Sequence, residues 1–261
     1  MVENGYMLLK DLMQLINKSN KESNDVMIAN IFIQNRYKLD EMSLDDIARK
    51  YYISQASLSR FIKKMGYKNY NSFRNDINLS CYYMKFKVPT ESHFSLQEIK
   101  EKVYQDISQV LENIHSLDTY HVQRVLDLIS NYQNIYFFGS ELSMAIVYII
   151  QLVLTSLKKN VYTIYDINYQ REVQKKLNQD DLVICISIEG RWYETQRAES
   201  YLFQTKAYKM LWTLDSNHVD KESFDNVYIF GKDVKYDLGY NELMYFVYFI
   251  YQALLSDSFK K

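Results

Sequence analysis

Apolar positions recur at helical spacing through the first third of the chain. Residues 6–17 and 24–34 carry such stripes and predict two helices. Residues 43–66 then read as two shorter helices joined by a tight turn, and residues 71–84 as a further helix. Gly66 suits the left-handed residue that commonly ends a helix. The first third of the chain is therefore predicted to be all helical.

Two serines mark where the paired short helices begin. Ser43 and Asp46 have the spacing of a capping box, in which a hydroxyl and a carboxylate satisfy free amides of the first turn. Ser54 supplies the N-cap of the second helix. Opposite the apolar stripe of that helix lie small polar side chains and cations: Gln55, Ala56, Ser57, Ser59, Arg60 and Lys63. Small residues let a helix approach base edges and cations reach phosphates, so this stretch predicts a helix-turn-helix.

The remaining two thirds of the chain follow a different pattern. A capping box at Ser95 and Glu98 opens one predicted helix, and a second is expected over residues 119–131. Apolar runs then alternate with helical stretches. The runs, predicted to be strands, are 134–138, 161–165, 181–187, 208–214 and 227–230, and the helices are 142–157, a polar one ending at 177, 192–204 and 240–255. Strands that are hydrophobic throughout indicate a parallel sheet covered on both faces.

The lone proline, Pro89, interrupts the pattern between these two regions. We therefore predict a helix-turn-helix domain over residues 1–87, a linker over 88–95 and a second domain over 96–261. The fold class is α/β, with an all-α helix-turn-helix domain followed by a doubly wound parallel-sheet domain.

The charge is unevenly distributed between the two predicted domains. Residues 36–87 hold eleven Lys and Arg against five Asp and Glu, about +6, whereas the whole chain carries a net charge of −1. A basic module on an acidic body is typical of a nucleic-acid-binding protein, so double-stranded DNA is the expected partner. The residues expected to bind it are Ser54, Gln55, Ser57, Ser59, Arg60, Lys63, Lys64 and Lys68. For the lysines, a solvated basic face is the alternative.

Other features bear on compartment and assembly. The charge-free run 142–157 has 16 residues, short of the ~20 that a membrane span needs, and is expected to be a buried crossover helix. No signal peptide is evident, and two distant cysteines favour neither a disulfide nor a zinc site, so a cytoplasmic protein without cofactor or metal is expected. The helix 240–255 is apolar nearly all round, which predicts a homodimer or tetramer.

Residues 28–35 and 42–77 resemble the N-terminal domain of RpiR-type bacterial transcriptional regulators. The family's Arg-Phe-x-Lys-Lys-Leu-Gly-aromatic ending is met by residues 60–67, with Met65 in the Leu position. Tyr52 stands in the turn where the family usually has Gly. The resemblance implies a DNA-binding transcriptional regulator.

Two loops are similar to the ligand loops of the sugar isomerase (SIS) domain, which in RpiR-type regulators binds phosphorylated sugars. The loops are residues 139–143 and 187–194. They keep five residues of the family patterns: Gly139, Ser143, Ser187, Gly190 and Glu194. They depart from the patterns at three: Glu141, Glu189 and Trp192. The resemblance makes the candidate effector-binding residues Ser140, Glu141, Ser143, Ser187, Glu189, Arg191 and Glu194.

The two replacing carboxylates change the expected ligand. Within about 5 Å of a dianion each would repel it by roughly 2 to 3 kcal/mol per unit of its charge. A sugar phosphate bound in the family manner is therefore disfavoured. A cleft kept only for dimerisation, or a neutral or amine-bearing sugar-related effector, remain as alternatives.

Two further functions compete with the regulator. A sugar-phosphate isomerase would use Glu194 or Glu189 as the base, assisted by His218, but the altered phosphate loops argue against it. An oligomerisation scaffold would use its helix-turn-helix to pack on a protein, and salt-dependent DNA binding distinguishes it from a regulator.

Overall fold

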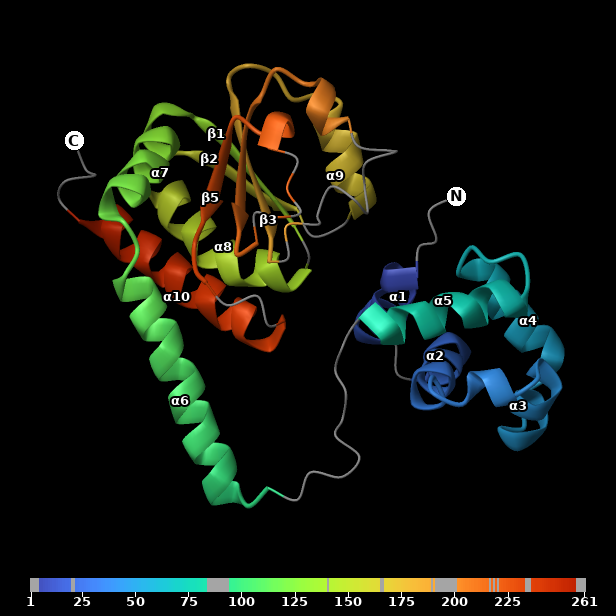
Figure 1. Cartoon of the computed structure of the whole chain (residues 1–261). Helices are drawn as coiled ribbons and strands as arrows, with labels where there is room; N and C mark the ends of the chain where they lie inside the picture. The colour runs from blue at the N-terminus through green and yellow to red at the C-terminus, as the bar shows by residue number, and fades with distance from the viewer. Residues whose placement is uncertain are drawn as a thin grey trace. The chain divides into compact units, whose positions relative to one another are not determined.

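The structure is a computed structural model that describes residues 5–19, 22–83, 94–139, 141–164, 167–188, 190, 201–215, 217, 219, 221–232 and 236–256 (Figure 1). Contacts divide the chain into two compact units, Met1–Ser92 and His93–Lys261, called here the N-terminal and C-terminal units.

The described part of the N-terminal unit is entirely helical. Its elements are α1 (Gly5–Lys18), α2 (Asn24–Gln34), the 3-10 helix η1 (Leu39–Glu41), α3 (Leu44–Lys50), α4 (Gln55–Lys64) and α5 (Tyr70–Tyr83). The buried Phe32 of α2 lies at the centre, with its ring centroid 4.7 Å from that of Phe73 and 6.0 Å from that of Phe61. These aromatic contacts fix α4 and α5 against α2, as the apolar stripes predict.

The predicted helix caps of the N-terminal unit are confirmed. Ser43 Oγ accepts a hydrogen bond from the Asp46 amide at 3.1 Å, and the Asp46 carboxylate accepts one from the Ser43 amide at 2.9 Å. Ser54 Oγ accepts from the Ser57 amide at 3.1 Å. Gly66, just after α4, has a φ of +88°, the left-handed conformation expected from the sequence.

The C-terminal unit is built on five parallel strands in the order β2-β1-β3-β4-β5. The strands are β1 (Asn134–Gly139), β2 (Asn160–Ile164), β3 (Asp181–Ser187), β4 (Tyr208–Thr213) and β5 (Asn226–Ile229). The helices are α6 (Leu96–His115), α7 (Thr119–Asn131), α8 (Glu141–Ser156), α9 (Ile167–Gln174) and α10 (Tyr236–Leu255), with 3-10 helices η2 (Leu202–Gln204) and η3 (Lys221–Ser223).

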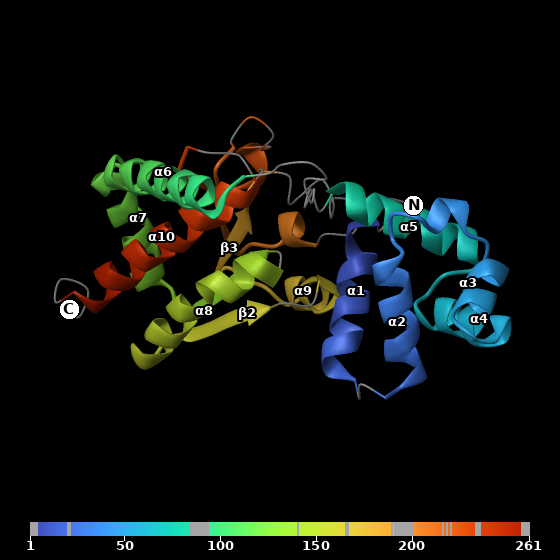
Figure 2. The ribbon, with the colours of Figure 1, turned by 90° about the horizontal axis from the view of Figure 1, so that it is seen from below.

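Helices cover both faces of this sheet, so the predicted fold class is confirmed (Figures 1 and 2). On β3, Leu182 and Ile184 face a core shared with α7, α8 and α10. The alternate residues Val183 and Cys185 face a smaller core that includes Leu177 and Leu202. Cys185 is free and fully buried, as the sequence predicts, and burial raises the pKa of its thiol.

Some element boundaries differ from the predictions. The polar helix expected to reach 177 ends at Gln174, and α10 begins at Tyr236 rather than near 240. Most of the helix expected over 192–204 lies outside the described residues, and its last three positions form the 3-10 helix η2. The residues at these two helix ends carry little apolar periodicity, so the sequence pattern does not define the boundaries there.

Helix α8 contacts β1, β2 and α10, as expected of a crossover helix. Its burial is incomplete within one chain, because Leu142, Tyr148, Ile149 and Leu152 on its outer side are between 37% and 53% exposed. Among the described residues no helix combines the length and apolar character needed to cross a membrane.

Candidate nucleic-acid interface

Helix α4 is anchored to the N-terminal unit by one face. Leu58, Phe61 and Ile62 are almost completely buried in the core beneath it. The turn from α3 is closed by a hydrogen bond from the Ile53 amide to the Ala48 carbonyl at 3.0 Å. The apolar residues therefore fix which side of α4 faces outward.

The outward side of α4 carries the predicted DNA-binding residues. Exposed residues there are Ser54, Gln55, Ala56, Arg60, Lys63 and Lys64, with Lys68 just beyond the helix, and Ser57 and Ser59 are half-buried. The first turn of α4 carries small or uncharged polar side chains, and the cations lie toward the C-terminal end of the helix. We call this outward side of α4, with Lys68 just beyond it, the α4 face.

Hydrogen bonds order the polar groups at the start of the α4 face. Gln55 Nε2 donates to Asp45 Oδ1 on α3 at 2.8 Å. The hydroxyls of Ser54 and Ser57 share a hydrogen bond of 2.9 Å, and Arg60 Nη2 donates to Ser57 Oγ at 3.4 Å. Because these bonds are solvent-exposed, each can be exchanged for a bond to a ligand at little cost.

The cations around α4 fall into two groups. Lys64 Nζ lies 2.5 Å from Asp25 Oδ2 on α2, and Arg49 of α3 is ion-paired with both Asp45 and Asp46. In the described part of the chain, no ion pair involves Arg60, Lys63 or Lys68. These three cations therefore give the α4 face its available positive charge. The sequence pattern alone did not separate Lys64 from them.

The turn between α3 and α4 holds an unusual residue. Tyr52 has a φ of +54° and is 97% exposed. A residue with a Cβ in the left-handed region costs on the order of 1 kcal/mol relative to Gly. The turn therefore keeps a left-handed residue although Tyr replaces the usual Gly, and the exposed tyrosine side chain gains no packing in return.

The predicted effector loops are only partly described. Ser143 is buried in α8 and Ser187 is half-buried at the end of β3. A Cβ on Gly139 would lie 2.9 Å from the Ile186 carbonyl oxygen, so the first loop requires glycine where β1 ends. Gly190 has a φ of +70°. The predicted residues Ser140, Glu189, Arg191 and Glu194 lie outside the described residues, as do Trp192, His218 and the side chain of Glu141.

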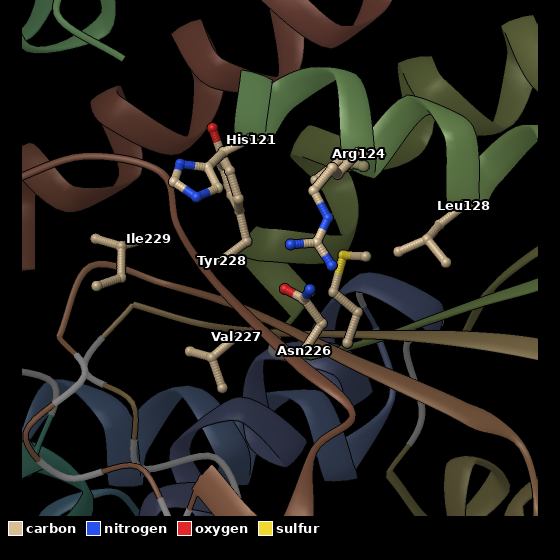
Figure 3. Close-up of a pocket in the computed structure, with 9 residues that line it drawn as sticks. His121, Arg124, Leu128, Asn226, Val227, Tyr228 and Ile229 are labelled. Atoms are coloured by element: carbon tan, nitrogen blue, oxygen red, sulfur yellow. The ribbon is translucent and has the colours of Figure 1, made fainter. Parts of the chain in front are cut away.

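One pocket of about 290 Å³ lies along the edge strand β5, and the described residues that line it include none of the predicted effector residues. Figure 3 shows Arg124 extending from α7 toward Asn226, with Tyr228 beside it and Ile229 farther away, beyond Tyr228. His121, also on α7, is held by Asp118 with Nδ1 3.2 Å from Oδ2. No sequence motif marks this pocket, because it joins residues of α7 and β5 that lie about a hundred positions apart. Within the described residues, no cluster of three His, Cys, Asp or Glu side chains could hold a metal ion.

A family model described as "Helix-turn-helix domain, rpiR family" matches residues 8–82, which span α1 to α5. The N-terminal unit is an rpiR-family helix-turn-helix domain. This agrees with the resemblance drawn from residues 28–35 and 42–77. The matched range includes α3 and α4, the two helices that the sequence predicts to form the helix-turn-helix.

Two curated relatives share sequence beyond that domain. An uncharacterized HTH-type transcriptional regulator of Thermotoga maritima is 25% identical over 188 residues, covering 70% of this chain and 66% of the relative. An uncharacterized HTH-type transcriptional regulator of Providencia stuartii is 22% identical over 197 residues, with the same two coverages. The match thus spans just under two thirds of each relative's length.

Solved structures that match this chain do so at low sequence identity. The NanR protein of Vibrio vulnificus, complexed with ManNAc-6P, is 16% identical and has a TM-score of 0.49, covering 95% of this chain and 91% of its own. The sugar isomerase domain of an RpiR transcription factor from Sphaerobacter thermophilus is 16% identical with a TM-score of 0.49, covering 60% of this chain and 89% of its own.

Proposed function

We propose that this protein is a DNA-binding transcriptional regulator in which the rpiR-family domain reads double-stranded DNA. The observation that carries the proposal is the α4 face: an outward helix side with small polar residues first and cations after them, of which Arg60, Lys63 and Lys68 form no ion pair with any described residue. Duplex DNA presents base edges in a groove bordered by phosphates, and this arrangement complements both.

We assign roles along the α4 face from the N-terminal end of the helix. Gln55, Ser57, Ser59 and Arg60 contact base edges, since the first turns of a recognition helix lie deepest in the major groove. Ser54 lies at the groove edge as the N-cap. Lys63 and Lys68 contact phosphates, and Lys64 does so after exchanging Asp25 for the DNA backbone.

The C-terminal unit is proposed to hold two copies together. Apolar side chains on three of its helices are exposed within one chain, among them Val103 on α6, Leu152 on α8 and Tyr248 on α10. A subunit interface would remove such apolar side chains from water, and two helix-turn-helix domains must be paired to read two half-sites. A homodimer, or a tetramer of two such dimers, would cover these side chains.

An effector would act by changing the pairing of the two copies. A ligand that prefers one arrangement of the dimer would alter the spacing of the two α4 faces and hence operator affinity. A neutral or amine-bearing sugar-related metabolite fits the sequence of the loops around Glu141 and Glu189 better than a phosphosugar does. No described residue favours the isomerase alternative.

The proposal is tested by selecting bound duplexes from a random-sequence library with the full chain. We expect enrichment of a sequence with two related half-sites. A double variant, Arg60→Ala with Lys63→Ala, is expected to enrich nothing above background while keeping the wild-type unfolding curve. Failure of the wild-type chain to retain any duplex at low salt would overturn the proposal.

A further inference from the structure

We propose that Tyr52, in the turn between α3 and α4, contacts the DNA backbone, with its hydroxyl donating a hydrogen bond to a phosphate at the rim of the groove that α4 enters. This inference rests on the proposed function and adds a contact outside the α4 face. It makes the turn itself part of the interface.

Folding does not explain why a tyrosine occupies this position. Its backbone has a φ of +54°, which glycine adopts without strain, and its side chain is 97% exposed. No hydrogen bond or ring contact of the Tyr52 side chain occurs with any residue that the structure describes. The ring therefore contributes nothing to the core and would be better replaced by glycine if only the fold mattered.

The place of Tyr52 in the motif puts it near a phosphate strand. In a helix-turn-helix the first helix crosses the DNA backbone while the second lies in the major groove, so the turn between them passes the rim of the groove. Tyr52 precedes the N-cap Ser54 by two residues. Because its side chain is exposed to solvent, its hydroxyl is free to reach a phosphate at that rim.

The cations next to the turn already have partners within the unit, so a neutral hydroxyl at Tyr52 would supply a hydrogen-bond donor that they do not. Arg49 is ion-paired with Asp45 and Asp46, and Lys50 Nζ donates to Asn35 Oδ1 at 3.3 Å. The two cations next to the turn are thus already engaged within the unit. A tyrosine hydroxyl can donate to a phosphate oxygen without a charge of its own, which is a common type of protein–DNA contact.

The test compares Tyr52→Phe and Tyr52→Gly with the wild-type full chain, using the duplex that the wild-type chain enriches. We expect about fivefold weaker binding for Y52F and about tenfold for Y52G. The slope of log affinity against log salt concentration should not change in these variants, because a neutral tyrosine releases no counterions. Lys63→Ala should make that salt dependence less steep. The unfolding midpoint of Y52G should be equal to or above that of the wild type.

Lys158→Gly is the matched control, since Lys158 has a φ of +63° in the C-terminal unit. It relieves similar backbone strain and should leave DNA affinity unchanged. Wild-type affinity in Y52G, with the duplex still bound by the wild-type chain, would overturn the inference and leave the proposed function standing. Failure of the wild-type chain to bind any duplex would overturn both.

Discussion

Gln55 on α4 donates a hydrogen bond to Asp45 on α3, with Nε2 2.8 Å from Oδ1. The bond joins the two helices of the helix-turn-helix on the surface proposed to meet DNA. On the proposed surface, the exposed Asp45 carboxylate competes with a base edge for the Gln55 amide. When DNA binds, Gln55 therefore exchanges its exposed hydrogen bond to Asp45 for one to a base.

Gln55→Ala should reduce discrimination between sequences without unfolding the domain. We expect specific affinity to fall by about 1 to 3 kcal/mol while binding to random-sequence duplex hardly changes, because the lost contact is to a base. The measurement is a pair of titrations with enriched and scrambled duplexes. Gln123→Ala is the matched control, because Gln123 donates to Asp127 at 2.8 Å in an exposed bond on α7. An equal loss on both duplexes would contradict the assignment.

Arg60→Ala and Lys63→Ala should weaken binding in different ways. Loss of Arg60 should cost about 1 to 3 kcal/mol and relax specificity at one position, as expected for a base contact. Loss of Lys63 should weaken binding to all duplex sequences alike. It should also reduce the magnitude of the slope of log affinity against log salt concentration by about 0.9. Lys64→Ala should have less effect, since Lys64 is paired with Asp25 in the free protein.

Lys206→Ala, an exposed lysine of the C-terminal unit, controls for the change in net charge. Titrations at several salt concentrations separate these cases. If Lys63→Ala and Lys206→Ala gave the same slope of log affinity against log salt concentration, Lys63 would not contact the DNA.

The capping box at Ser43 and Asp46 should make the N-terminal unit sensitive to acid. Hydrogen bonds from the Ser43 hydroxyl and amide hold the pKa of the Asp46 carboxyl below its usual range. A lowered folded-state pKa contributes stability above the unfolded-state value, near 4, and that stability is lost as the pH falls through the folded-state value. Urea unfolding of Asp46→Asn should show lower stability at neutral pH and a smaller loss on acidification.

The two urea curves should therefore converge at low pH. Curves for wild type and Asp46→Asn that stay parallel from pH 7 to 3 would show that the capping box does not titrate with unfolding. Glu98→Gln provides the equivalent comparison for the capping box of α6 in the C-terminal unit.

A buried polar pair supports the C-terminal unit. Asn113 of α6 donates to the fully buried carboxylate of Glu242 on α10, which also accepts from the Lys232 amide at 3.0 Å. Asn113→Leu should destabilise the unit by about 1 to 3 kcal/mol, because a buried acceptor loses a donor. Gln105→Ala, at an exposed position of the same helix, should change stability by less than about 0.5 kcal/mol. Similar unfolding curves for the two variants would show that the pair is dispensable.

Leu152→Glu should break the proposed pairing of subunits. Leu152 is 53% exposed on α8, and a carboxylate buried there in a dimer interface would be strongly unfavourable. Light scattering is expected to give a dimer or tetramer for the wild type and a monomer for the variant. A wild-type monomer at micromolar concentration would contradict the proposed assembly.

Features set by local chemistry were predictable from the sequence. Ser43 and Ser54 cap helices, Gly66 takes a left-handed conformation, and the apolar run at 181–187 is a central strand, because each signal depends on neighbouring residues. The exposure of Gln55 and Arg60 also followed from helical spacing.

Features set by tertiary contacts were not predictable. Lys64 pairs with Asp25, 39 positions away, and Asn113 meets Glu242, 129 positions away. The Gln55–Asp45 bond depends on the angle between α3 and α4, which the apolar pattern does not specify. The pocket beside β5 combines α7 with an edge strand, a juxtaposition that only the sheet order determines.

The salt dependence of binding by the full chain to its enriched duplex decides whether the α4 face contacts DNA. We predict that the logarithm of the affinity falls linearly with the logarithm of salt concentration, and that this dependence becomes less steep when Lys63 and Lys68 are both replaced by Ala. Absence of binding at low salt, or an unchanged salt dependence in that double variant, would show that the α4 face does not bind the duplex.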